Sequence, residues 1–122
     1  MDKAITKLNR IKVFSSWEEA ENRISIHAAE RIKVGNKTLC IARNQHGFYV
    51  LDNKCPHQGG SLGKGFCNNE GEIICPWHHH GFNVKTGHGR GDYVDVYPIE
   101  ITEEGFFVLL PKSFWSLFSD LF

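Results

Sequence analysis

The sequence contains no long hydrophobic run, and this absence excludes a membrane-spanning helix. A spanning helix needs about 20 consecutive apolar residues, and the 122 residues contain no such stretch. The first residues, among them Lys3 and Lys7, are not followed by the apolar segment of a secretory signal. We therefore expect a cytoplasmic protein with no membrane partner.

Net charge is absent as well. Lys and Arg number 14, Asp and Glu number 14, and the formal net charge is zero. A neutral chain offers no broad basic surface for nucleic acid, so we expect no nucleic-acid partner. No G-x-G-x-x-G pattern follows a predicted strand, which disfavours a dinucleotide site. The length favours a single domain over residues 1–122.

Cysteine is scarce, with four residues in the chain. Cytosolic thiols are kept reduced, so these cysteines are interpreted as metal ligands or free thiols rather than disulfides. Cys40 lies in an apolar segment and is expected to be a buried free thiol. Cys67 lies in a glycine-rich region and is also interpreted as a free thiol.

Short alternating segments separated by turn residues predict an all-β fold, an antiparallel sandwich or barrel. Ser16 followed by Glu19 predicts a capped short helix over 16–21, and Gly35-Asn36 predicts a hairpin turn. Nine of the twelve glycines lie between Gly59 and Gly91, so that stretch is expected to form loops rather than core. The expected strands are 10–14, 31–34, 37–42, 48–51, 72–74, 82–84, 93–96, 99–102 and 106–110.

Two short segments each combine a cysteine with a histidine. They read Cys-Pro-His over 55–57 and Cys-Pro-Trp-His over 75–78, which is C-x-H, seventeen residues, then C-x-x-H. A [2Fe–2S] cluster needs four protein ligands. Cys55 and Cys75 can hold one iron, and His57 and His78 the other. Neutral imidazoles in place of two thiolates raise the potential relative to an all-cysteine cluster.

A zinc site is the alternative for two cysteines and two histidines. Structural zinc sites usually pair the cysteines close together and the histidines close together. Here each segment is mixed, which suits two irons better than one zinc ion. A further alternative is that these residues are structural and lie in unrelated turns, but two cysteines each followed directly by proline make it less attractive.

The two loops resemble those of Rieske-type ferredoxins of the low-potential, oxygenase-associated type, and the resemblance continues through residues 83–87. It implies an antiparallel β-structure with a small inserted cluster-binding subdomain, roughly 52–91. It also implies that the histidine ligands lie near the surface. The implied cofactor is one [2Fe–2S] cluster, and the implied ligands are Cys55, His57, Cys75 and His78.

The sequence departs from the high-potential branch of that family. That branch carries an extra cysteine in each loop, where this chain has Gly60 and Trp77, and hydroxyl donors at the positions of His80 and Phe82. Fewer donors to sulfur stabilise the reduced cluster less. We therefore expect a potential of about −150 mV, near the low end of the Rieske range.

The run of three histidines at 78–80 leaves a second choice of ligand. The C-x-x-H spacing of the family selects His78, and a shift of register would select His79. His79 and His80 are interpreted as solvent-facing.

The resemblance implies an electron carrier between a flavin-dependent reductase and a terminal oxygenase. The chain is not expected to be the oxygenase, because no room remains for a second domain with a mononuclear iron. An alternative is the small subunit of an NAD(P)H-dependent nitrite reductase. A redox sensor is disfavoured because no output element is present.

The last eleven residues predict an amphipathic helix over 112–122. Six large apolar side chains occur there, at 114, 115, 117, 118, 121 and 122. Such a helix packs on its own domain or docks on a partner or second copy. We therefore expect a monomer or a weak oligomer through this helix.

Overall fold

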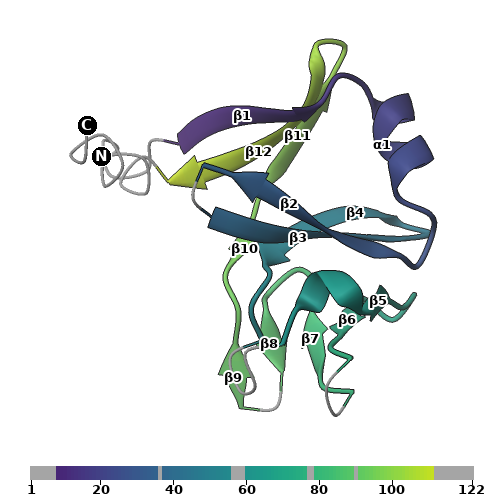
Figure 1. Cartoon of the computed structure of the whole chain (residues 1–122), viewed down its shortest axis with the longest axis vertical. Helices are drawn as coiled ribbons and strands as arrows, with labels where there is room; N and C mark the ends of the chain where they lie inside the picture. Colours follow the sequence, from purple (N-terminus) through teal and green to yellow (C-terminus); the bar gives the residue numbers. More distant parts are fainter. Residues whose placement is uncertain (1–7, 36, 56–59, 77–78, 90, 112–122) are drawn as a thin grey trace.

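The computed structural model describes residues 8–35, 37–55, 60–76, 79–89 and 91–111. Within them the fold is mostly antiparallel β-structure, as predicted, with one α-helix and no closed barrel (Figure 1). The elements are β1 (Leu8–Phe14), α1 (Trp17–Arg23), β2 (Ala29–Val34), β3 (Lys37–Asn44), β4 (Gly47–Asp52), the 3-10 helix η2 (Leu62–Lys64), β5 (Phe66–Cys67), β6 (Glu72–Ile74), β7 (Gly81–Asn83), β8 (His88–Gly89), β9 (Asp92–Tyr93), β10 (Val96–Tyr97), β11 (Ile99–Thr102) and β12 (Gly105–Pro111).

Two sheets form the base of the molecule. One has the order β1-β12-β11 and the other β10-β4-β3-β2, and a hydrophobic core lies between them (Figure 1). Three phenylalanines from both sheets lie at its centre. The ring of Phe106 makes edge-to-face contacts with Phe14 at 5.5 Å and with Phe48 at 5.3 Å between centroids. Such pairs add to the burial of the rings and hold the two sheets together.

The predicted helix cap is confirmed. Ser16 is the N-cap of α1, and its hydroxyl accepts a hydrogen bond from the Glu19 N–H at 3.1 Å. Glu19 Oε1 in turn accepts from the Ser15 N–H, one residue before the cap. The helix buries Ala20 against the base core.

The predicted hairpin after β2 is also confirmed. Val34 of β2 pairs with Lys37 of β3, and Gly35 between them has φ 64°. Glycine adopts this left-handed conformation without the steric cost that a side chain imposes. Asn36 lies outside the described residues.

The stretch between Gly59 and Gly91 is more than loops, which corrects the sequence-based expectation. It contributes the sheet β5-β6-β7, η2 and β8, and a second hydrophobic cluster in which Leu62, Ile73 and Phe82 are fully buried. The sequence predicted strands at 72–74 and 82–84, which match or overlap β6 and β7, but it missed β5 and β8, because strands of two residues are too short to show an alternating pattern. The expected strand 93–96 is likewise two strands, because β9 pairs with β8 whereas β10 pairs with β4.

Asparagines connect the base to the part of the molecule that holds β5, β6 and β7. The buried Asn44 ends β3, and its Nδ2 donates to the Asn68 carbonyl at 3.0 Å. Asn69 Oδ1 accepts from the Gln45 N–H at 3.2 Å. These bonds tie the β3–β4 turn to the β5–β6 turn, and so hold the strand β6 that leads to Cys75.

No helix in the described ranges is long and apolar enough to cross a membrane. The predicted helix over 112–122 lies outside the described residues. The last described strand, β12, ends at Pro111, which pairs with Leu8 of β1.

Candidate metal centre

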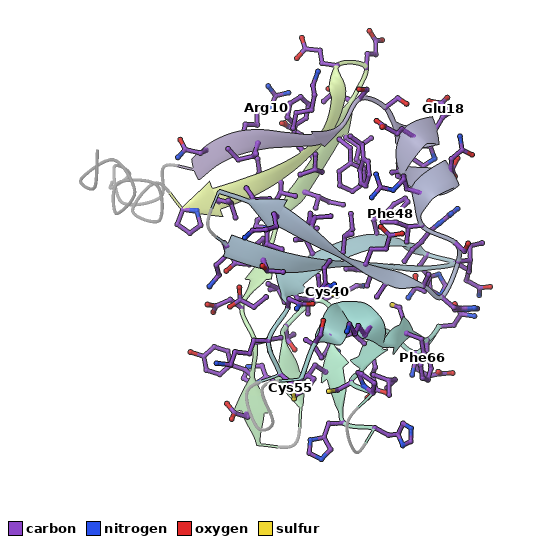
Figure 2. All side chains as sticks on the ribbon, viewed as in Figure 1. Arg10, Glu18, Cys40, Phe48, Cys55 and Phe66 are labelled. Carbon is purple, nitrogen blue, oxygen red and sulfur yellow. The ribbon has the colours of Figure 1, made fainter. Side chains whose placement is uncertain are left out.

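The structure gathers Cys55 and Cys75 in one hydrophobic cluster. Cys55 lies three residues after the end of β4, and Cys75 directly follows β6. Both side chains are fully buried, and both belong to the second core. Figure 2 shows Cys55 at the opposite end of the molecule from Arg10. The other two predicted ligands, His57 and His78, lie outside the described residues.

The two cysteine loops close in the same way. The Cys55 N–H donates to the Gly60 carbonyl at 2.8 Å, and the Cys75 N–H donates to the His80 carbonyl at 2.7 Å. In each loop the bond joins the cysteine to the residue five positions further along the chain. Both loops therefore begin at a buried thiol, and one backbone bond joins their two ends.

The second loop is the connection of a β-hairpin. β6 and β7 pair through Ile74 and Gly81, which flank the loop on either side. Within it His79 has φ 58°, a left-handed conformation that is uncommon for residues other than glycine. His79 is exposed as expected, whereas His80 is half-buried, which corrects the expectation that both face solvent. The His80 carbonyl that closes the loop holds this residue against the protein.

The β8–β9 hairpin packs closely on the end of the second loop. A Cβ atom at Gly89 would collide with the carbonyl oxygen of Gly81 and lie 2.9 Å from the Phe82 ring. Only glycine allows this close approach. Phe82 itself is fully buried and has no hydroxyl to offer to a sulfur atom.

Cys40 and Cys67 are buried free thiols, as predicted. Burial raises the pKa of Cys67 to about 11. Burial, reinforced by Cys67, raises the pKa of Cys40 even further above its ordinary value. Both thiols lie in the same cluster as Cys55 and Cys75, but in strands rather than in the loops.

The chemistry of the described residues fits an iron–sulfur cluster. Two thiols lie at the start of two loops, in an apolar environment, and thiolates are the ligands that iron–sulfur clusters prefer. Within the described ranges no three His, Cys, Asp or Glu side chains gather around one point. Half of the predicted ligand set lies outside those ranges.

A family comparison identifies the cofactor. The model of the Rieske [2Fe-2S] domain matches residues 17–96, which is more than half of the chain. The chain therefore belongs to the Rieske [2Fe–2S] domain family, and its cofactor is one [2Fe–2S] cluster.

Individual proteins agree with the family. The 3-phenylpropionate/cinnamic acid dioxygenase ferredoxin subunit of Escherichia coli K12 is 27% identical over 89 residues, which cover 69% of this chain and 84% of that subunit. Human apoptosis-inducing factor 3 is 29% identical over 86 residues, 67% of this chain. The match spans only 14% of that human protein.

Solved structures share the fold. The complex of reduced oxygenase and oxidized ferredoxin in carbazole 1,9a-dioxygenase contains a chain with 26% identity and a TM-score of 0.66, covering 81% of this chain and 91% of that one. A putative NADH-dependent nitrite reductase small subunit from Mycobacterium tuberculosis has 17% identity and a TM-score of 0.69, covering 84% and 95%.

The two free thiols are expected to resist alkylation in the folded protein. With a pKa of about 11, only about one Cys67 thiol in a thousand is a thiolate at pH 8, and the thiolate is the reactive form. Intact mass after iodoacetamide treatment should show no adduct on native protein and four adducts after unfolding in guanidinium with a chelator. A Cys67→Ser control should show three. Rapid labelling of native Cys67 would contradict its buried position.

Proposed function

We propose that this chain is a soluble, cytoplasmic one-electron carrier that passes electrons from a flavin-dependent reductase to a terminal oxygenase. It is the electron-transfer component of such a system rather than the enzyme that acts on the substrate. The supporting observation is the match to 84% of a dioxygenase ferredoxin subunit, so that nearly the whole of that carrier corresponds to this chain. A related chain occurs in a complex with an oxygenase.

The proposed ligands are Cys55 and Cys75 for one iron, and His57 and His78 for the other. When bound, the cluster accepts and releases one electron. The protein supplies buried thiols in an apolar cluster, and loops closed by backbone bonds restrict how far these thiols move. Small movement of the ligands between the two charge states favours fast electron transfer.

Replacement of adjacent histidines tests the ligand set. His78→Ala should abolish the visible absorption and the EPR signal of the reduced Rieske cluster, because one iron loses a ligand. His79→Ala is the matched control, since His79 is exposed, and it should leave both spectra unchanged. The reverse result, colour lost in His79→Ala and kept in His78→Ala, would move the ligand by one position.

The midpoint potential is expected near the low end of the Rieske range, at about −150 mV. Gly60 provides no thiol for a bracing disulfide, and the buried Phe82 provides no hydroxyl for a sulfur atom. Protein-film voltammetry and a dye-mediated titration should give the same one-electron midpoint. A value above zero would contradict the assignment to the low-potential type.

The small subunit of a nitrite reductase is the alternative, and the shared fold does not separate the two functions.

In the carrier that we propose, residues 112–122 form a helix that packs on its own domain. Deletion of these residues should then lower the melting temperature and leave the mass measured by light scattering that of a monomer. An unchanged melting temperature with loss of self-association would instead assign the helix to a contact between copies. Purification from the native host as a stable heteromer would favour the reductase subunit.

A further inference from the structure

One side chain joins the two ends of the first cysteine loop. Asn53 lies between β4 and Cys55, and its Oδ1 accepts hydrogen bonds from the Gly63 N–H at 2.7 Å and from the Ser61 hydroxyl at 3.1 Å. Its backbone carbonyl accepts from the Leu62 N–H at 2.7 Å. Asn53 therefore joins the departing and returning ends of the loop through both its side chain and its backbone.

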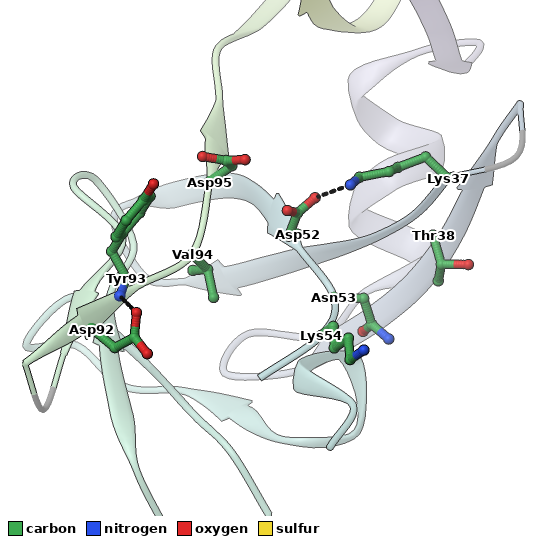
Figure 3. Close-up of a pocket in the computed structure, with 9 residues that line it drawn as sticks. All are labelled: Lys37, Thr38, Asp52, Asn53, Lys54, Asp92, Tyr93, Val94 and Asp95. Carbon is green, nitrogen blue, oxygen red and sulfur yellow. Dashed lines mark hydrogen bonds and ion pairs between the residues drawn. The ribbon is translucent and has the colours of Figure 1, made fainter. Parts of the chain in front are cut away.

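The departing end is anchored to the base. Asp52, directly before Asn53, donates its N–H to the Asp95 carbonyl at 2.9 Å. Its Oδ1 accepts from the Tyr97 hydroxyl at 2.9 Å. The same oxygen lies 3.3 Å from Lys37 Nζ (Figure 3). Burial, with the Asp52 hydrogen bond, raises the pKa of Tyr97 well above its ordinary value, so this hydroxyl keeps its proton and remains a donor.

The returning end is packed against the protein at Leu62 and Gly63. Leu62 is fully buried in the second core. A Cβ atom at Gly63 would lie 2.5 Å from Arg31 Cγ and 2.8 Å from Asn53 Oδ1. The chain at Gly63 therefore fits between β2 and the Asn53 amide with no room for a side chain.

The two cysteine loops differ in how their ends are held. The β6–β7 ladder pairs the chain on either side of the second loop. Among the residues of the first loop that the structure describes, one isolated bridge joins Lys54 and Ser61. The ends of the second loop are held by backbone bonds between β6 and β7. At the ends of the first loop, the Asn53 side chain makes the corresponding connection.

We propose that Asn53 is a positioning residue for the cluster: its amide oxygen holds the two ends of the first loop together and thereby sets the geometry of the ligands on it. The proposal rests on the proposed assignment of Cys55 and His57 as ligands. Asn53 touches neither the metal nor a substrate and acts through the loop. Groups in this second layer typically change metal retention by about 10- to 100-fold when they are lost.

Three variants of the cluster-loaded protein test this role. Asn53→Ala removes the acceptor, and Asn53→Asp keeps an acceptor oxygen at the same place. Asn83→Ala is the matched control, because Asn83 Oδ1 also accepts from two backbone N–H groups, those of Lys85 and Thr86. It lies at the end of β7 away from Cys75, opposite Glu72.

The readouts are the EPR g-values of the reduced cluster, the midpoint potential and the rate of bleaching by an iron chelator. Asn53→Ala should bleach about tenfold faster and shift both the g-values and the potential. Asn53→Asp should bleach within about twofold of the parent, with a lower potential because of its added negative charge. Asn83→Ala should keep all three values, whatever its effect on melting temperature.

The inference is overturned if Asn53→Ala keeps the parent g-values, potential and bleaching rate, or if Asn83→Ala changes them equally. If Asn53→Ala does not assemble a cluster, Ser61→Ala is the second variant, because it removes one of the two donors to Asn53 Oδ1. Ser61→Ala should accelerate bleaching to a smaller extent. An unchanged bleaching rate in Ser61→Ala also overturns the positioning role. Cys55→Ala separates this failure from failure of the ligand set. A cluster retained in Cys55→Ala refutes the ligand assignment, whereas a cluster lost there together with an unchanged Asn53→Ala refutes only the positioning role.

Discussion

The backbone hydrogen bond that closes each cysteine loop is the interaction on which the centre depends. The N–H of Cys55 bonds to Gly60 and the N–H of Cys75 to His80, so that each thiol lies at the start of a closed loop. A loop that is closed before the cluster binds presents its thiol in a restricted position. The rest of the fold holds the chain on either side of each loop in place.

Two hydrophobic clusters hold the chain in place, one within the base and one around the cysteines. The base core around Phe14, Phe48 and Phe106 holds two sheets together and lies away from the cysteines. The second cluster, which contains Cys55 and Cys75, also includes Cys40, Ala42 and Leu51 of the base strands β3 and β4, and polar contacts add to this apolar connection. Asn44 and Asn69 form such polar connections to the β5–β6 turn, and the Asp52 contacts with Lys37 and Tyr97 form them at the end of β4.

Much of the base could be predicted from the sequence, because its strands are long enough to show a pattern. Strand β11 was predicted with its observed bounds, and the Ser16 cap and the hairpin at Gly35 were predicted from local preferences. The region between Gly59 and Gly91 was wrongly expected to lack a core. Its strands have two or three residues each, and Leu62, Ile73 and Phe82 come together only when those strands pair.

The sequence by itself determined the expected chemistry of the centre, since its two mixed Cys/His loops suit a [2Fe–2S] cluster and resemble those of the Rieske family. Only the tertiary structure decided how the loops are held. Asn53 was not singled out from the sequence, because an asparagine before a cysteine gives no sign of which N–H groups its oxygen will meet. Those donors, on Ser61 and Gly63, are eight and ten residues away and approach Asn53 only in the folded chain. The half-buried position of His80 has the same origin, because a contact across a loop depends on the partner that the fold provides.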